Sequence, residues 1–267
     1  MTLLLSLLLV AGMAGASDIG SGIGNNIGSD VNYIAVDVRS GAIIEQRWAD
    51  AAAPIPLGSL VKPFTALAYP GAFPEFVCTG AASRCWLAHG HGRLRFREAL
   101  AQSCNAYFLN LAGGVDPGTL AVVAAKFGIA APEVDSAETR IGLGDGWRIS
   151  PLALVHAYAE LASRTGEPRV NEILAGLELA ARSGTASAVG REFAKTGTAL
   201  RAGAKTGTAP CAGIGAANRK HATDGFTMVL APADSPRIAL LVRVHGVTGA
   251  EAAKSAARIL REMREAP

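Results

Sequence analysis

The sequence predicts a mixed α/β fold (α+β) built from one sheet and a helical subdomain. Strand patterns lie near both ends of the chain, at residues 34–48 and 226–244, while residues 59–179 have helical periodicity. At 267 residues, of which 50% are hydrophobic, the chain can build a sizeable core in one large domain or two small ones. Strands from both ends most simply pair in one sheet, with the helices inserted between them.

The N-terminal segment predicts export. Residues 1–16 hold an apolar run followed by Ala14 and Ala16 in the A-x-A pattern of a signal peptidase site, although no Lys or Arg precedes the run. A membrane-tethered, uncleaved segment is the alternative. Residues 17–30 are rich in Gly, Ser and Asn and predict a flexible leader, so the folded domain is expected at residues 31–267. We therefore expect the protein in the periplasm or cell envelope.

The charge balance argues against two classes of partner. The net charge at pH 7 is +3, and the basic residues are scattered along the chain rather than clustered. Binding to nucleic acid or to lipid headgroups needs a basic patch on the surface. We therefore expect no nucleic-acid partner.

Two pairs of strands are predicted. Large apolar residues alternate with other residues over 34–38, a Ser-Gly turn follows, and residues 42–48 return as the second strand of a hairpin. Residues 226–231 and 237–244 carry two further strands joined by a proline-flanked turn.

Two helix starts are clear in the sequence. Ser150 and Pro151 predict one helix as its N-cap and first-turn residue. Thr248 and Glu251 form a capping box that predicts the last helix, since a hydroxyl and a carboxylate three residues apart satisfy free N–H groups. Loops are expected at residues 71–83 and 88–92.

Ser59 and Lys62 are the first candidate catalytic pair. A serine hydroxyl needs a base to act as a nucleophile, and a lysine can serve where its surroundings favour the neutral amine. In a helix that starts at Ser59, the i+3 spacing places the Lys62 amine beside the Ser59 hydroxyl. Pro63 lacks an N–H, so the Ser59 carbonyl loses its i+4 partner and the first turn should be distorted. Alone, this S-x-x-K tetrad is weak evidence, because an ordinary helix start can contain it.

Ser103 and Asn105 are two polar residues in an otherwise apolar stretch. Ser103 could pass a proton between Lys62 and a leaving amine, while Asn105 could hold a substrate amide or Lys62 itself. A turn between two helices would also contain these residue types, and taken alone this second interpretation is the stronger.

The tetrapeptide Lys-Thr-Gly-Thr occurs twice, at residues 195–198 and 205–208, inside a ten-residue tandem repeat. A strand with this sequence beside a pocket can bind a carboxylate through Lys and Thr, and its glycine lets a substrate backbone approach. If the second copy forms the strand at the site, the loop from it to the next strand, at residues 226–231, is shorter than the loop from the first copy. Long structureless loops are uncommon in compact domains. We therefore favour the second copy, Lys205, Thr206, Gly207 and Thr208, over the first, Lys195, Thr196 and Gly197.

The chain has four cysteines: Cys78, Cys85, Cys104 and Cys211. In an oxidising compartment, Cys78 and Cys85 are the predicted disulfide, because they are close in sequence and flank a loop. A metal site formed by these two cysteines with His89 and His91 is the alternative, but the spacing matches no standard zinc pattern. We expect no metal and no cofactor.

In the order S-x-x-K, S-x-N, K-T-G, the three motifs resemble the signature of penicillin-binding proteins and serine β-lactamases. The surrounding sequence is similar to the transpeptidase domain of class B penicillin-binding proteins of the elongation type, from about Tyr33 to the C-terminus. The similar stretches are residues 59–64, 85–86, 90–92, 97–103, 149–152 and 157–159.

This resemblance implies an antiparallel sheet that carries the N- and C-terminal helices, a helical subdomain, and an active site in the cleft between them. It implies that Ser59 attacks the penultimate D-alanine of a peptidoglycan stem peptide, expels the terminal D-alanine and passes the acyl group to an amine. β-Lactams would acylate Ser59 by mimicking this substrate. By the same resemblance, Lys62 is the base, Ser103 passes the proton on, and Asn105 positions the reacting groups. Lys205 and Thr206 bind the substrate carboxylate, and the N–H groups of Ser59 and Thr208 form the oxyanion hole.

The sequence departs from the family in two respects. The N-terminal pedestal and membrane anchor of class B proteins have no counterpart, which puts in doubt the expected partnership with cell-wall synthesis proteins. The interval between Ser59 and Ser103 is short, so we expect a trimmed helical subdomain. Two other functions stay open: a D,D-carboxypeptidase or β-lactamase, in which water releases the acyl group, and a non-catalytic sensor that binds penicillin.

Overall fold

The computed structural model describes residues 27–195, 201–211 and 223–265. The predicted signal peptide and most of the predicted leader lie outside these residues. Ile27, within the segment predicted as leader, is buried, and its carbonyl accepts a hydrogen bond from the Arg47 guanidinium at 2.9 Å. Packing against the core therefore includes the first described residue.

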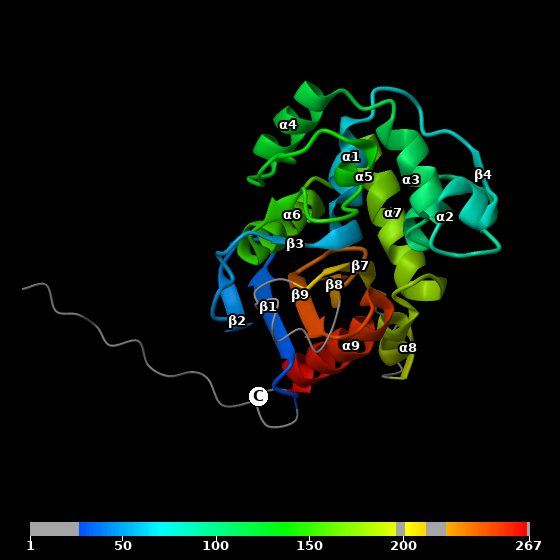
Figure 1. The fold of residues 1–267 in the computed structure, drawn as a ribbon. Helices are drawn as coiled ribbons and strands as arrows, with labels where there is room; N and C mark the ends of the chain where they lie inside the picture. The colour runs from blue at the N-terminus through cyan, green and yellow to red at the C-terminus, as the bar shows by residue number, and fades with distance from the viewer. Residues whose placement is uncertain (1–26, 196–200, 212–222, 266–267) are drawn as a thin grey trace, which may run out of the picture.

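A five-stranded sheet forms the centre of the fold, with the strand order β2-β1-β9-β8-β7 and every neighbouring pair antiparallel (Figure 1). The strands are β1 (Val31–Asp37), β2 (Ile43–Arg47), β7 (Gly203–Pro210), β8 (Thr223–Ala231) and β9 (Ile238–His245). β1 pairs with β9, with Val31 opposite Val244, so the early and late strands are neighbours. The prediction of one antiparallel sheet built from both ends of the chain is confirmed.

Helices cover both faces of this sheet. Helix α9 (Gly249–Glu265) and α8 (Ser187–Lys195) belong to one buried cluster together with Tyr33, while α6 (Pro151–Ser163) shares the other cluster with Ile34. Successive residues of a strand point to opposite faces, so the alternate side chains of β1 serve two cores. The sheet is consequently the middle layer of the fold, as Figure 1 shows with α6 and α9 on opposite sides of it.

The remaining helices form the helical subdomain. They are η1 (Gly58–Val61), α1 (Lys62–Ala68), α2 (Phe96–Ala101), α3 (Asn105–Ala112), α4 (Pro117–Lys126), α5 (Ala137–Arg140) and α7 (Pro168–Ser183). Helix α7 packs against α2 and also against β7, so it joins the subdomain to the sheet. No single helix among the described residues is long and apolar enough to cross a membrane; α3 and α4 reach that length only as a pair bent by 109°.

Two short ladders complete the structure. One pairs β3 (Ile55–Pro56) with β6 (Arg148–Ile149), and the other pairs β4 (Phe76–Cys78) with β5 (Gly92–Leu94). Strand β4 and the turn η2 (Gly80–Ser83) lie in the stretch 71–83 that the sequence predicts as a loop, and β5 begins at the last residue of the predicted loop 88–92. Strands of three residues are too short to display the alternation that identifies a strand.

Both predicted helix starts are confirmed. The Ser150 hydroxyl accepts a hydrogen bond from the Ala153 N–H at 3.1 Å, with Pro151 in the first turn of α6. The Glu251 carboxylate accepts from the Thr248 N–H at 2.8 Å, while the Thr248 hydroxyl accepts from the Glu251 N–H at 3.4 Å. Local hydrogen bonds therefore set where α6 and α9 begin.

Two glycines allow β7 to lie against the turn that contains Ser59. Gly58 has φ +59°, and a Cβ there would lie 2.5 Å from the Thr208 carbonyl oxygen. A Cβ on Gly207 would lie 2.5 Å from the Leu57 carbonyl oxygen. Only glycine fits such a backbone contact, so these residues bring the subdomain and the edge of the sheet together.

Candidate active site

Ser59 lies in the short 3₁₀ turn η1, immediately before α1. The Lys62 N–H donates to the Ser59 carbonyl, which is the i+3 bond that remains when Pro63 removes the i+4 donor. The Tyr158 hydroxyl, buried in α6, donates to the Leu60 carbonyl at 2.7 Å. The predicted distortion of the first turn is thus present, and a hydrogen bond from another helix holds it.

Lys62 is fully buried in the subdomain. Its amine donates to Asn105 Oδ1 at 2.7 Å and to the Ser103 carbonyl at 2.9 Å, and lies 3.4 Å from Ser103 Oγ. Because burial disfavours the charged form, it lowers the pKa of Lys62 to about 7. A substantial share of the Lys62 amine is therefore neutral near pH 7, as a general base requires.

Ser103 lies in the turn between α2 and α3, where its backbone has φ +49°. A serine in this left-handed region is strained by roughly 1–3 kcal/mol unless its surroundings hold it. Both lysines contact its side chain: Lys62 Nζ at 3.4 Å, and Lys205 Nζ, which donates to Ser103 Oγ at 2.8 Å. The Ser103 hydroxyl is positioned to exchange a proton with either amine.

Strand β7 supplies the other side of the site. Lys205 is fully buried and also donates to the Thr206 carbonyl at 2.7 Å. Burial and the neighbouring Lys62 ammonium lower the pKa of Lys205 well below its ordinary value. Thr206 Oγ1 shares a 2.6 Å hydrogen bond with Thr185 Oγ1, and Thr208 Oγ1 accepts from the Gly249 N–H at 2.9 Å.

Among the residues that the structure describes, the second Lys-Thr-Gly copy shares a cavity with Ser59 through Thr206 and Gly207. Lys195 is the last residue of α8, its side chain is 73% exposed, and its amine pairs with Glu192 at 3.5 Å. Thr196 and Gly197, the rest of that copy, lie outside the described residues. Lys205 instead lies against Ser103 in the buried centre of the site.

These residues border a cavity of about 350 Å³. It is lined by Ser59, Trp86, Ser103, Asn105, Leu143, Thr185, Thr206, Gly207, Thr208, Thr248 and Ala250. The sequence predicts no site role for Trp86, Leu143, Thr185, Thr248 and Ala250, and it predicts Thr248 only as a helix cap. Trp86 and Thr185 meet motif residues through the fold: the Trp86 indole N–H donates to the Ser103 carbonyl at 3.3 Å, and Thr185 bonds to Thr206. Leu143 and Ala250 carry no chemical signal.

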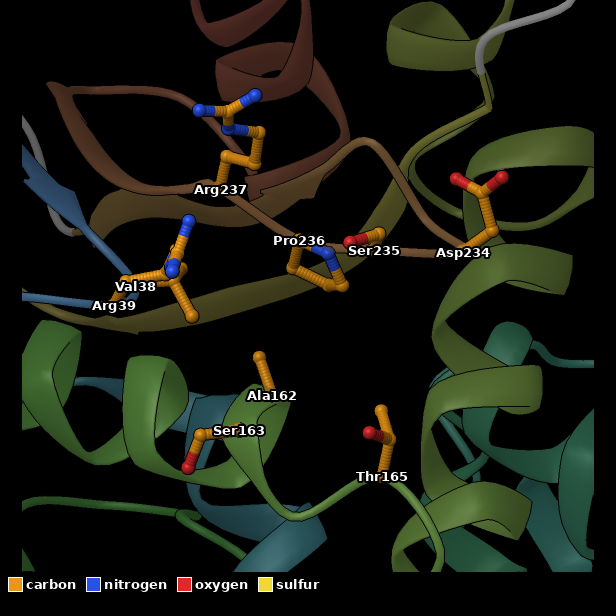
Figure 2. A pocket seen from close by; sticks show the side chains of 9 residues that line it. All are labelled: Val38, Arg39, Ala162, Ser163, Thr165, Asp234, Ser235, Pro236 and Arg237. Carbon is orange, nitrogen blue, oxygen red and sulfur yellow. The ribbon is translucent and has the colours of Figure 1, made fainter.

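A second cavity, of about 460 Å³, contains none of the predicted site residues. It lies where β8 turns into β9, between the residues that end α6, such as Ser163, and the turn that holds Ser235 (Figure 2). In Figure 2 the Arg237 guanidinium points away from the α6 residues rather than toward them. Ser59, Ser103 and Asn105 line the first cavity and are not among the residues that line the second.

The disulfide predicted between Cys78 and Cys85 is absent, because both residues are free thiols in a larger cluster with His91 and Cys104. Cys104 comes from the turn between α2 and α3, and its sulfur lies 3.8 Å from that of Cys85. The alternative metal set in the sequence analysis contained His89, but His89 is exposed. Cys104 takes the place predicted for His89, because the fold brings the turn between α2 and α3 next to Cys78, Cys85 and His91.

This cluster has the dimensions of a tetrahedral zinc site. Zinc holds sulfur at about 2.3 Å and nitrogen at about 2.0–2.1 Å, which separates two sulfurs by about 3.8 Å and a sulfur from a nitrogen by about 3.6 Å. The His91 Nδ1 atom lies 3.5 Å from Cys85 Sγ and 3.6 Å from Cys78 Sγ. Burial alone would raise the pKa of Cys78, but hydrogen bonds from the Gly80 backbone and from His91 lower it to about 6, which favours the thiolate that zinc binds. Burial raises the pKa of Cys104 to about 12, so zinc would have to displace the proton of that thiol. The distances and the ligand types are those of a zinc site, and these residues can therefore hold zinc.

A second group of potential ligands, Cys211, Asp224 and His245, has different dimensions. His245 Nδ1 and Asp224 Oδ1 are 2.7 Å apart, which is a hydrogen bond and too short for two ligands of one metal ion. The fully buried Asp224 carboxylate also lies 4.0 Å from the Arg243 guanidinium. We therefore interpret the contact between His245 and Asp224 as a structural hydrogen bond and not as part of a metal site.

The sequence spacing predicts no metal, but the cluster in the fold leads us to expect the opposite. Protein purified without chelators should contain about one zinc ion per chain, and Cys104→Ser or Cys85→Ser should lose it. Because the metal binds only the folded state, its loss should lower the free energy of unfolding by at least about 2 kcal/mol. Metal analysis by mass spectrometry and thermal unfolding measure both effects. Cys211→Ser, outside the cluster, is the matched control, and full zinc content in Cys104→Ser would contradict the assignment.

Solved structures share this fold. Pseudomonas aeruginosa PBP2, solved in complex with WCK 5153, is 19% identical with a TM-score of 0.68, over 88% of this chain and 70% of that one. The transpeptidase domain of the FtsI4 D,D-transpeptidase from Legionella pneumophila is 19% identical with a TM-score of 0.65, over 88% and 89%. The Helicobacter pylori complex between PBP2 and MreC gives 16% identity and a TM-score of 0.68, over 88% and 60%. At these identities, the likeness establishes the fold.

The sequence itself matches one family. The profile of the penicillin binding protein transpeptidase domain matches residues 78–265, which include Ser103 and Lys205 and begin after Ser59 and Lys62. No curated protein matches the chain. Because the profile covers well over half of the sequence, the chain belongs to the penicillin-binding protein transpeptidase domain family.

Proposed function

We propose that the protein is a serine D,D-transpeptidase that forms an acyl-enzyme on Ser59 with the D-alanyl-D-alanine end of a peptidoglycan stem peptide. The observation that carries this proposal is the buried Lys62 amine, one turn after Ser59 and hydrogen-bonded to Asn105. A neutral amine in that position can take the proton of a serine hydroxyl. Family membership supports the same reaction class.

In the first step, the Lys62 amine accepts the Ser59 proton while Ser59 Oγ attacks the carbonyl carbon of the penultimate D-alanine. The carbonyl oxygen becomes an oxyanion, and the N–H groups of Ser59 and Thr208 are the proposed donors to it. When the intermediate collapses, the C–N bond breaks and the amine of the terminal D-alanine leaves with a proton. Ser103 Oγ, 3.4 Å from Lys62 Nζ, is the proposed relay for that proton.

The terminal carboxylate of the substrate is proposed to bind at Lys205 and Thr206. Without substrate, burial and Lys62 disfavour the charged form of Lys205. An arriving carboxylate supplies the missing counter-charge and restores the ammonium form, since an opposite charge at contact distance stabilises it. Substrate binding and protonation of Lys205 are therefore coupled.

Release of the acyl group to an amine, rather than to water, is favoured by the cleft lining. None of the described residues that line the cavity is an acid or a histidine, so these residues offer no additional base to activate water. A fast β-lactamase needs such a base. D,D-carboxypeptidase activity and a penicillin-binding sensor are the alternatives that the labelling experiment separates.

The proposed setting is the cell envelope, with β-lactams as covalent inhibitors and cell-wall synthesis proteins as partners. The Helicobacter pylori neighbour was solved as a complex between PBP2 and MreC, which supports a partner of that kind. This chain spans 60% of that neighbour's length.

Fluorescent penicillin tests the proposed function. The wild type should carry one label that persists, whereas Ser59→Ala should carry none while its free energy of unfolding stays within about 1 kcal/mol of the wild type. Rapid loss of label indicates a β-lactamase. Release of D-alanine without a new cross-link from a pair of stem peptides indicates a carboxypeptidase, and persistent label without any reaction on peptides indicates a sensor. Unchanged labelling of Ser59→Ala would refute the mechanism.

Lys205→Ala should slow acylation of Ser59 by about tenfold or more, because it removes a charge-assisted contact of roughly 1.5–3 kcal/mol. Lys195→Ala removes an exposed amine from the same tetrapeptide and is the matched control, so its acylation rate should equal that of the wild type. A time course of penicillin labelling, stopped at set intervals by denaturation, measures both rates. The reverse pattern would move the carboxylate site to the first copy.

The acylation rate should rise with pH through about 7. The neutral amine of Lys62 is the active form, and with a pKa of about 7 its population grows about tenfold between pH 6 and pH 8 and then levels off. Labelling rates measured between pH 5.5 and 9 give the profile, and the residual rate of Lys62→Ala should lack the inflection. A wild-type rate that is flat over this interval would exclude Lys62 as the base.

A further inference from the structure

Thr185 is a polar residue of the cleft lining that the proposed mechanism does not use. It lies between α7 and α8 and lines the same cavity as Ser59 and Thr206. Its hydroxyl shares a 2.6 Å hydrogen bond with Thr206 Oγ1 and donates to the Ala101 carbonyl at 3.3 Å. Ala101 ends α2, the helix that precedes Ser103. Thr185 therefore connects the strand with the proposed carboxylate site to the other motif segment of the cleft.

The backbone holds both partners of the 2.6 Å contact. The Thr185 N–H donates to the Ala101 carbonyl at 3.1 Å, so this carbonyl accepts from both the backbone and the side chain of one residue. Thr206 lies in β7, where it faces Thr227 of β8, and it is only 5% exposed. The two hydroxyls therefore meet because a sheet strand and a helix end fix their positions.

The direction of these hydrogen bonds follows from the donors available. A backbone carbonyl only accepts, so the single proton of the Thr185 hydroxyl points to Ala101. Thr206 must then donate its own proton to Thr185 across the 2.6 Å contact. In this arrangement Thr206 Oγ1 presents only lone pairs to the cleft, and a carboxylate, which also only accepts, cannot bind to it.

A carboxylate at Thr206 requires both hydroxyls to turn. Thr206 has to donate to the carboxylate, and Thr185 can then donate to Thr206 Oγ1 instead of to Ala101. The bond given up, at 3.3 Å, is the longer of the two that the Thr185 hydroxyl makes, and the Ala101 carbonyl keeps its bond from the Thr185 N–H. Hydrogen bonds in a chain polarise one another, so the reversed chain strengthens the bond from Thr206 to the carboxylate.

We propose that Thr185 is a positioning residue for the substrate carboxylate, which acts through Thr206 by a hydrogen-bond chain whose direction reverses when the carboxylate binds. This inference rests on the proposed function, since that function brings a carboxylate to Lys205 and Thr206. Lys205 supplies the charge at this place, whereas Thr185 orients the Thr206 hydroxyl and supports it as a donor.

Thr185→Val keeps the branched shape of the side chain and removes its hydroxyl. It should lower kcat/KM for acylation by N-benzoyl-D-alanyl-thioglycolate, a thioester that ends in a carboxylate, by about three- to tenfold, the usual effect of one neutral hydrogen bond. The neutral amide of this thioester should react equally with Thr185→Val and the wild type, and Thr185→Ser should restore the rate with the carboxylate. An equal loss with both thioesters, or no loss with the carboxylate, would overturn the proposal.

A double variant tests whether Thr185 acts through Thr206. When Thr206→Val is already present, adding Thr185→Val should leave kcat/KM for the carboxylate thioester unchanged, because the chain has lost the member that touches the substrate. A further loss of about threefold or more in that background would show that Thr185 contacts the substrate directly, and the positioning role would be wrong.

Binding without acylation separates this inference from the proposed function. In Ser59→Ala, calorimetry should show that adding Thr185→Val weakens the binding of benzylpenicillin, which carries a carboxylate, about three- to tenfold and leaves the binding of its methyl ester unchanged. This result in a protein whose wild type no peptide acylates would refute the transpeptidase and keep the role of Thr185. Acylation of the wild type by peptides, with no effect of Thr185→Val on benzylpenicillin binding, would keep the transpeptidase and refute the role of Thr185.

Discussion

Two buried lysine side chains meet at one serine, and the rest of the candidate site depends on this contact. Lys62 reaches Ser103 from α1, and Lys205 reaches it from β7. Neither amine is exposed, so each loses hydration, and two ammonium groups so close would repel each other. The proposed proton transfer lies on the Lys62 side and the proposed anion site on the Lys205 side, and the Ser103 hydroxyl contacts both amines.

The fold explains why three distant segments can converge. The sheet places β7 at its edge, and the contacts permitted by Gly58 and Gly207 bring that edge against the turn with Ser59. Helix α7 packs on both β7 and α2, and so links the edge of the sheet to the helix that precedes Ser103. Because each joint is made by backbone or helix packing, the polar side chains between them have little freedom.

The thiol cluster connects this site to the loop that precedes it. Cys104 stands between Ser103 and Asn105, and Cys85 stands next to Trp86. The cluster thus lies directly beside Ser103 on one side and beside Trp86, whose ring meets His91, on the other. A zinc ion bound there would stabilise the geometry of the cleft without taking part in the reaction.

The sequence by itself determined the class of fold, the three motifs and their order. Local chemistry carries these signals: alternation in the strands, the caps at Ser150 and Thr248, and a proline after Lys62. It could not show that Cys104 joins Cys78, Cys85 and His91, that both faces of β1 are buried, or that Trp86 and Leu143 line the cleft. Only the tertiary structure decided these points, because they depend on contacts between residues far apart in the chain, and spacing along a sequence carries no information about where a distant turn folds back.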